Sequence, residues 1–164
     1  MLVLAQNTTM NIVVPLNNAN GNGTCSPGPV TGMEYTVTAS SPGLQAVLAC
    51  NQPAYDALKN ADLTQPQSAN LPAPLLDMSC TAPNTTTCTK QMPMNRQLRS
   101  QVMCILLKGA TPANGQTGKT VTATVTVTWM TGSQTSATGT SSHISVNKAL
   151  TAFAGLIAFL LIVA

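Results

Sequence analysis

The sequence predicts a mainly β protein: a small, disulfide-stabilised antiparallel β-sandwich with a C-terminal apolar tail helix. Three observations support this class. Several short segments combine β-branched residues with alternating apolar and polar positions, which is typical of half-buried strands. Turns rich in glycine and proline separate these segments. Five cysteines are spread along 164 residues without the close spacing of metal ligands, which favours disulfides.

Five strands and one helix are expected in chain order. The clearest strand is VTATVTVTW, in which small or β-branched apolar residues alternate with threonines. The helix PAYDALKN is short and starts with a proline, which suits a first turn. Between Thr64 and Met94, several prolines and two cysteines suggest a long irregular segment. The expected strands are 10–15, 34–38, 45–50, 101–108 and 120–129, and the expected helix is 53–60.

Residues 113–120, ANGQTGKT, fit the loosest form of a phosphate-binding loop. Such a loop needs a helix directly after its Lys-Ser/Thr pair, because the helix N-terminus holds the phosphate. Here Thr120 instead opens the alternating strand pattern, and Ala113 replaces the first glycine. We therefore expect Gly109–Lys119 to be a polar connection between two antiparallel strands, and we expect no nucleotide binding.

The chain offers little for charge-based recognition or catalysis. Charged residues make up 7% of it, and the net charge is +3. Apart from Arg96 and Arg99 the basic residues are dispersed, with no aromatic residues between them, so nucleic-acid binding is not expected. His143 is the single histidine and lies in a linker. No catalytic residue, metal ligand or cofactor site is predicted, since no pattern brings together the four carboxylates Glu34, Asp56, Asp62 and Asp77.

The cysteines predict one disulfide and leave a second open. Cys80 and Cys88 bracket the polar loop TAPNTTT and are expected to pair. Of Cys25, Cys50 and Cys104, at most two can pair within the chain. The third is then a buried thiol, a bridge to another chain, or a cysteine whose partner precedes the given sequence.

One possible pair, Cys50 with Cys104, would cross-link two sheets as in an immunoglobulin domain, because both residues lie on apolar runs. In that family a tryptophan follows shortly after the first cysteine. Here Trp129 comes after the second one, so the family pattern is not met.

The C-terminal segments 131–148 and 149–164 differ sharply in composition. The first, TGSQTSATGTSSHISVNK, is a Ser/Thr/Gly-rich linker, and the second, ALTAFAGLIAFLLIVA, has no charge. At about 1.5 Å per residue a helix over the second would reach only about 24 Å. A membrane-spanning helix must cross about 30 Å of hydrocarbon. The segment is therefore expected to be either a removable signal or a short membrane segment.

This arrangement of small residues, polar spacer and apolar tail resembles the C-terminal signal of GPI-anchored cell-surface and cell-wall glycoproteins of eukaryotes. The resemblance covers about thirty residues and identifies no family for the preceding domain. It implies that the tail is replaced by a lipid in the secretory pathway. The implied attachment candidates are Gly139, Ser141 and Ser142.

Residues 7–130 are expected to form the extracellular β domain. Residues 1–6, MLVLAQ, are either the remnant of a signal peptide, with small or β-branched residues at the cleavage positions, or simply an N-terminal strand. Three N-x-Ser/Thr acceptors agree with secretion, and two of them lie in runs of turn residues. The predicted N-glycosylation sites are Asn7, Asn22 and Asn84.

Two functional hypotheses follow. The first is a glycosylated, lipid-anchored surface or cell-wall protein with a structural or adhesive role, whose partners are the membrane, another copy of itself or a wall polysaccharide. The alternating threonines of 120–129 resemble ice-binding or adhesive arrays, and this strand could pair with another chain if it lies at an edge. The second is a secreted ligand-binding or enzymatic domain, with a pocket lined by the methionines Met78, Met92, Met94 and Met103.

Overall fold

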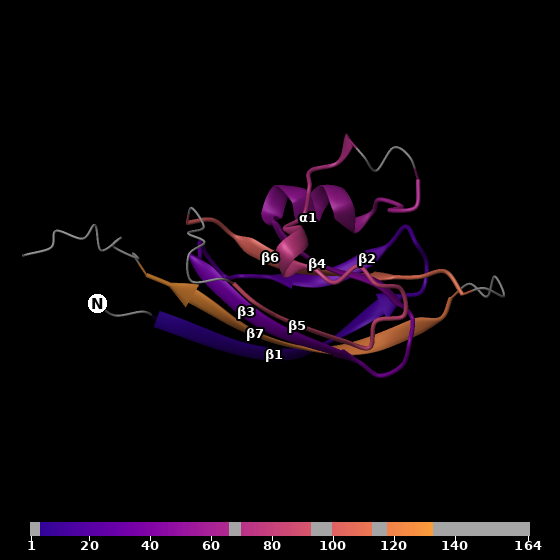
Figure 1. The fold of residues 1–164 in the computed structure, drawn as a ribbon, viewed down its shortest axis with the longest axis horizontal. Coiled ribbons are helices and arrows are strands. Elements are labelled where there is room, and N and C mark those ends of the chain that lie inside the picture. Colours follow the sequence, from indigo (N-terminus) through magenta and orange to yellow (C-terminus); the bar gives the residue numbers. More distant parts are fainter. Residues whose placement is uncertain (1–3, 66–69, 93–99, 113–117, 133–164) are drawn as a thin grey trace, which may run out of the picture. The chain divides into compact units, whose positions relative to one another are not determined.

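The computed structural model describes residues 4–65, 70–92, 100–112 and 118–132, which form two packed antiparallel sheets and one covering helix (Figure 1). The mainly β, disulfide-bonded sandwich predicted from the sequence is confirmed. The strands are β1 (Leu4–Pro15), β2 (Gly21–Cys25), β3 (Gly32–Ala39), β4 (Leu44–Asn51), β5 (Thr87–Gln91), β6 (Met103–Gly109) and β7 (Thr120–Thr131), and the helices are α1 (Gln52–Lys59) and the 3₁₀ turn η2 (Leu76–Met78).

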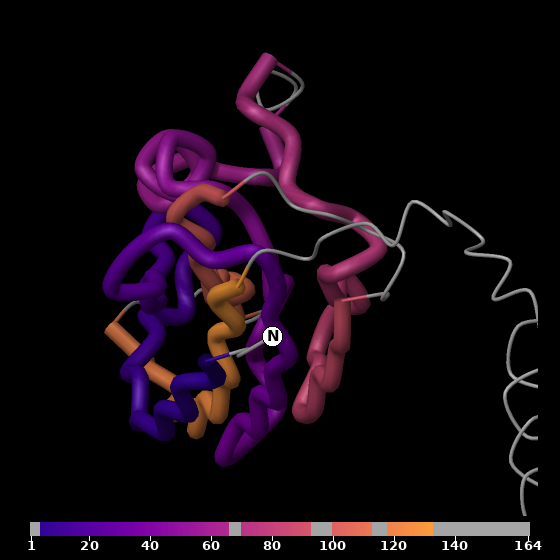
Figure 2. Tube along the Cα trace, turned by 90° about the vertical axis from the view of Figure 1, so that its left-hand side faces the viewer, coloured from indigo at the N-terminus to yellow at the C-terminus, as the bar shows by residue number. Residues whose placement is uncertain are grey.

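The first sheet has the strand order β1-β7-β3-β5. Figure 2 shows this order from indigo β1 to pink β5. Both β1 and β7 are twelve residues long, and they pair over their whole length. The alternation in β7 places its apolar residues in the core and its threonines outside, as the sequence predicts. The five core positions are Val121, Ala123, Val125, Val127 and Trp129.

The second sheet has the order β2-β6-β4, and its central strand is buried on both faces. One face packs against the first sheet through Met103, Ile105 and Leu107. The other face carries Cys104 and Leu106, which pack beneath α1. Burial on two sides explains why this strand is a continuous apolar run without alternation.

Helix α1 covers the outer face of the second sheet (Figure 1). Asn51 caps its N-terminus, because the Asn51 side chain accepts a hydrogen bond of 3.0 Å from the Ala54 N–H, and Pro53 suits the first turn. Tyr55 and Leu58 are buried against the sheet. The helix therefore closes a second, smaller apolar layer above β4 and β6.

Two strands of the structure are not predicted from the sequence. Strand β2 lies in the run NNANGNGT, which reads as a turn, and β5 lies within the segment 64–94 that was expected to be irregular. The predicted helix 53–60 is confirmed with bounds one residue earlier. Leu4–Gln6 form the start of β1, in agreement with the N-terminal strand that was one of the two expectations for MLVLAQ.

Candidate functional site: the threonine face

The outward face of the first sheet carries small polar side chains at matching positions on all four strands, and we call this surface the threonine face. Residues paired across an antiparallel sheet point to the same side, so each register row forms a line of neighbouring side chains. The three rows are Thr9-Thr126-Thr36-Thr89, Asn11-Thr124-Thr38-Thr87 and Asn7-Thr128-Glu34-Gln91. Eight of these twelve side chains are therefore threonine hydroxyls.

Hydrogen bonds within the rows hold several of these side chains in place. Thr9 Oγ1 lies 3.1 Å from Thr126 Oγ1, and Thr36 Oγ1 lies 3.1 Å from Thr89 Oγ1. In the neighbouring row the Thr124 hydroxyl donates to Asn11 Oδ1 at 2.9 Å. Rows repeat about every 6.8 Å along the strands, and strands about every 4.8 Å across them. The face is thus a regular array of partly pre-ordered hydroxyl groups.

The threonine face is almost uncharged, because Glu34 is the single ionisable residue among its twelve members. A shallow groove of about 260 Å³ lies beside Glu34 and Gln91, and Lys90 of β5 also contributes to its lining. Pockets that enclose small ligands typically measure about 300–1,000 Å³. The groove is below that range and open, so this surface suits contact with an extended partner better than capture of a small molecule.

The edge strands of this sheet are β1 and β5, and not the strand 120–129. Strand β7 lies between β1 and β3, so the expectation that it could pair with another chain from an edge is wrong. Just after β1, the Leu16 N–H donates a hydrogen bond to the Lys119 carbonyl. Hydrogen-bonded and non-hydrogen-bonded pairs alternate along two antiparallel strands, so the even-numbered residues of β1 are the ones that bond to β7. The backbone groups of Ala5, Asn7, Thr9 and Asn11 therefore point away from the sheet.

The three predicted N-glycosylation sites lie in different environments. Asn7 is exposed on the threonine face, and Asn84 is exposed in a turn with a φ of 59°. Asn22 lies within β2 instead of the turn expected from its neighbours. Its side-chain Nδ2 donates to the Val13 carbonyl at 3.1 Å, and its Oδ1 accepts from the Gly23 N–H at 2.9 Å. The Asn22 amide is therefore occupied in the folded domain.

Two disulfides stabilise the domain. Cys80 and Cys88 are bonded, and this is the pair that the sequence predicts. The second disulfide joins Cys25 of β2 to Cys104 of β6. Cys50 remains a buried free thiol on β4, so it lies in the same sheet as Cys104 and cannot cross-link two sheets. Disulfides persist in oxidising compartments, so these two indicate a secretory or extracellular environment.

Lys108, which the sequence predicts only as the end of a strand, is completely buried. Its Nζ donates hydrogen bonds to the carbonyls of Ala19 at 2.8 Å and Ala61 at 2.7 Å, and it also lies within 3.3 Å of the carbonyls of Leu58 and Lys59. Desolvation lowers the pKa of Lys108 to about 8, despite the opposing effect of Asp62. Because carbonyls at the C-terminal end of α1 surround its ammonium group, Lys108 has a structural role: it connects β6 to this end of the helix.

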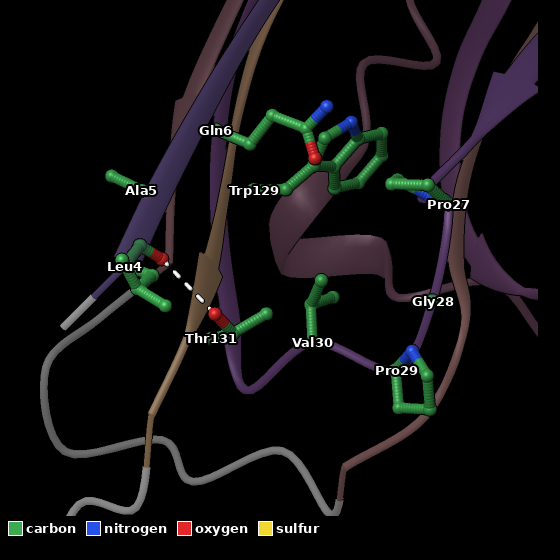
Figure 3. A pocket seen from close by; sticks show the side chains of 9 residues that line it. All are labelled: Leu4, Ala5, Gln6, Pro27, Gly28, Pro29, Val30, Trp129 and Thr131. Atoms are coloured by element: carbon green, nitrogen blue, oxygen red, sulfur yellow. Dashed lines mark hydrogen bonds between the residues drawn. The ribbon is translucent and has the colours of Figure 1, made fainter.

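A hollow of about 430 Å³ opens at the Trp129 end of the sandwich (Figure 3). Leu4, Gln6 and Thr131 approach it from β1 and β7, and the segment Pro27–Val30 closes the opposite side. Among the residues that the structure describes, its lining contains no ionisable side chain. This described lining therefore offers no ionisable group for acid–base chemistry.

The second sequence hypothesis, a methionine-lined pocket, gains little from the fold. Met78, Met92 and Met103 are buried members of the core between the sheets, and Met94 lies outside the described residues. Within the described parts of the chain, no three His, Cys, Asp or Glu side chains are grouped to hold a metal ion. Asp56 lies in α1, whereas Asp62 lies beyond the end of this helix.

The predicted tail helix at 149–164, the linker, His143 and the attachment candidates Gly139, Ser141 and Ser142 all lie outside the described residues. So do residues 113–117 of ANGQTGKT, but the part that follows Lys119 is a strand and not a helix. In the portion that the structure covers, no helix has the length and apolarity needed to span a membrane.

The comparisons with known proteins identify no family for the domain. The chain matches no protein-family model, and no curated protein is similar to it in sequence.

Proposed function

We propose that this protein is an extracellular, glycosylated surface or cell-wall protein, held by a C-terminal lipid anchor, whose threonine face adheres to a neutral, extended polysaccharide. The observation that carries the adhesive role is the array of hydroxyl and amide groups across four adjacent strands. The two disulfides support the location, since they form in an oxidising compartment.

A neutral polysaccharide is the partner that best fits the chemistry of this face. Polysaccharide chains present hydroxyl groups at regular intervals, and both threonine hydroxyls and asparagine amides can donate to them and accept from them. A net hydrogen bond contributes only about 0.5–1.5 kcal/mol, so one domain binds weakly. A lipid anchor would concentrate many copies on one surface, where multivalent contact compensates for weak single sites.

The adhesive role predicts that hydroxyl groups, and not the shape of the face, carry the binding. A Thr124→Val/Thr126→Val variant keeps the β-branched shape but removes two central hydroxyls. Displayed at high density on beads, it is expected to bind cellulose or an insoluble β-1,3-glucan at least fivefold less than the parent protein. The matched control, Thr124→Ser/Thr126→Ser, keeps both hydroxyls and is expected to retain binding.

Equal binding by the valine and serine variants would refute this role for the face. Inhibition of ice recrystallisation by the parent protein, lost in the valine variant and without polysaccharide binding, would instead assign the face to ice.

Glycosylation is expected at Asn84 and not at Asn22 when the domain folds before modification. Asn84 is exposed in a turn, whereas the Asn22 amide already donates to the Val13 carbonyl of β1 in the other sheet and accepts from the adjacent Gly23 N–H. Glycopeptide mapping of protein from a eukaryotic secretory host should find Asn84 occupied and Asn22 bare. A fully occupied Asn22 would show that the acceptor is modified before β2 pairs with β6.

The anchor proposal predicts that residues after the attachment site are absent from the mature protein. With a signal peptide supplied upstream, the protein should reach the cell surface and be released by a phospholipase that cleaves phosphatidylinositol anchors. Leu156→Arg/Leu160→Arg should abolish attachment, because each charge costs about 2.5–3.5 kcal/mol near the centre of an inserting helix. Intact mass after glycan removal decides the matter: a mature chain that still contains residues 149–164 rules out the anchor.

A further inference from the structure

Three of the five cysteines form one row across the second sheet. Cys25 of β2 is paired in register with Cys104 of β6, and Cys104 is paired in register with Cys50 of β4. Side chains at matching register positions point to the same side, and all three belong to the apolar layer beneath α1. The free thiol of Cys50 therefore faces a disulfide on the neighbouring strand.

The hydrogen-bond pattern shows that Cys104 can bond to either neighbour. The Gln52 N–H donates to the Val102 carbonyl, so Gln52 and Val102 are a hydrogen-bonded pair. Such pairs recur every two residues along antiparallel strands, so Cys50 and Cys104 are also a hydrogen-bonded pair. The Cα atoms of such a pair lie about 5.5 Å apart. Disulfides usually span Cα separations of about 4.4–6.8 Å. A Cys50–Cys104 bond therefore fits the sheet without a change of strand register.

We propose that Cys25, Cys104 and Cys50 form an internal thiol–disulfide exchange site with two alternative covalent states. The Cys50 thiolate attacks Cys104 Sγ, the Cys50–Cys104 bond forms, and the Cys25–Cys104 bond breaks. Cys25 leaves as a thiolate and takes up the proton that Cys50 gave up. One disulfide and one thiol are present before and after, so the exchange needs no oxidant or reductant.

The arrangement also suits the direction of attack. Exchange proceeds when the attacking sulfur approaches along the extension of the bond that breaks. A row that runs across three adjacent strands places the three sulfur-bearing side chains in this order, with Cys104 in the middle. Cys25 and Cys50 are separated by a whole strand, so they cannot pair with each other while the sheet is intact.

Helix α1 controls access to the reaction. Cys50 is only 1% exposed beneath it. Burial, together with the nearby Asp56, raises the pKa of the Cys50 thiol to about 12. Exchange requires the thiolate, so it is slow while α1 is in place. Displacement of α1 exposes Cys50 and moves Asp56 away, so neither burial nor this carboxylate then raises the pKa of the thiol. The product differs in an observable way, because Cys25 is only half-buried and its thiol can be reached by reagents.

A matched pair of variants tests the row. Cys25→Ser leaves Cys50 and Cys104 as neighbours, and peptide mapping of the secreted, folded protein should find them joined. Cys104→Ser leaves Cys25 and Cys50 on the two outer strands, and both should remain free thiols. Near-ultraviolet circular dichroism confirms folding of each variant. Free thiols at both Cys50 and Cys104 in folded Cys25→Ser protein would overturn the proposal.

The unmodified protein provides a second test that does not depend on variants. Mild urea, without reductant, loosens α1, and samples are quenched at intervals with iodoacetamide. The fraction of Cys25 that carries the label is expected to rise at least tenfold, together with a Cys50–Cys104 peptide. If label enters Cys50 alone and Cys25 stays bonded until global unfolding, exchange does not occur.

Discussion

Replacing Lys108 with methionine is expected to lower the free energy of unfolding by about 2–4 kcal/mol. The substitution keeps the approximate length of the side chain but removes the ammonium group. That group donates to four carbonyl oxygens, those of Ala19, Leu58, Lys59 and Ala61. A buried polar group left without a partner costs about 1–3 kcal/mol. The loss is smaller than the sum of four such terms, because removing the buried ammonium also removes its desolvation cost.

Urea denaturation followed by circular dichroism measures this loss, and Lys119→Met is the matched control. Lys119 is exposed, so its replacement should change stability by no more than about 0.5 kcal/mol. The damage in Lys108→Met is expected to begin at the C-terminal end of α1, where hydrogen exchange of the last helical turn should accelerate. Equal stability of the two variants would show that the buried amine does not hold the helix in place.

Lys108 also predicts how stability depends on pH. Burial lowers its pKa from 10.5 to about 8, so between these values the unfolded chain holds a proton that the folded protein lacks. The Lys108 contribution to stability therefore increases as the pH rises from about 8 to about 10.5. Cys50 and Tyr35 act in the opposite direction above about pH 9, because burial raises their pKa values.

The contribution of Lys108 is isolated by subtraction, since Cys50 and Tyr35 are present in both proteins and their effects cancel. The stability of the parent protein minus that of Lys108→Met should grow across this pH window. A difference that is constant or falls would contradict the lowered pKa.

The parts of the fold that could be predicted are those in which local pattern and final environment agree. Strand β7 alternates because one of its faces is core and the other solvent, and the period of two is visible in the sequence. Strand β2 was missed because its glycines and asparagine are typical of turns. These glycines are needed because β6 approaches β2 too closely for a side chain at their positions. The sequence of β2 alone does not show that another strand lies so close.

The candidate site was visible only in part for the same reason. The threonines of β7 suggested a flat array, but a single strand of this kind is usually the outer face of an ordinary sheet. What makes it an array is its register with β1, β3 and β5, which come from distant parts of the sequence. Lys108 and the cysteine row depend likewise on contacts between remote segments. The signal that was available for Lys108 was a charged residue at the end of an apolar run.

Adding a single methyl group at Gly23 is expected to be as damaging as losing Lys108. A Cβ atom there would overlap the Ile105 carbonyl oxygen and come within 3.0 Å of the Ile105 carbonyl carbon and the Leu106 Cα. All three are backbone atoms of the central strand β6, which is packed on both faces and cannot move aside. In Gly23→Ala, β2 must instead shift away from β6, at a cost of about 3 kcal/mol.

The shift also moves Cys25 away from Cys104, so Gly23→Ala links strand packing to the covalent state of the sheet. Gly28→Ala is the matched control, because a Cβ at Gly28 meets no atom within 4 Å. Urea denaturation should show a large loss for Gly23→Ala and almost none for Gly28→Ala. Disulfide mapping should find less Cys25–Cys104 in the first variant and more Cys50–Cys104, since Cys50 is then the neighbour that remains in register. Unchanged stability and pairing in Gly23→Ala would mean that β2 does not lie against β6 as closely as its glycines require.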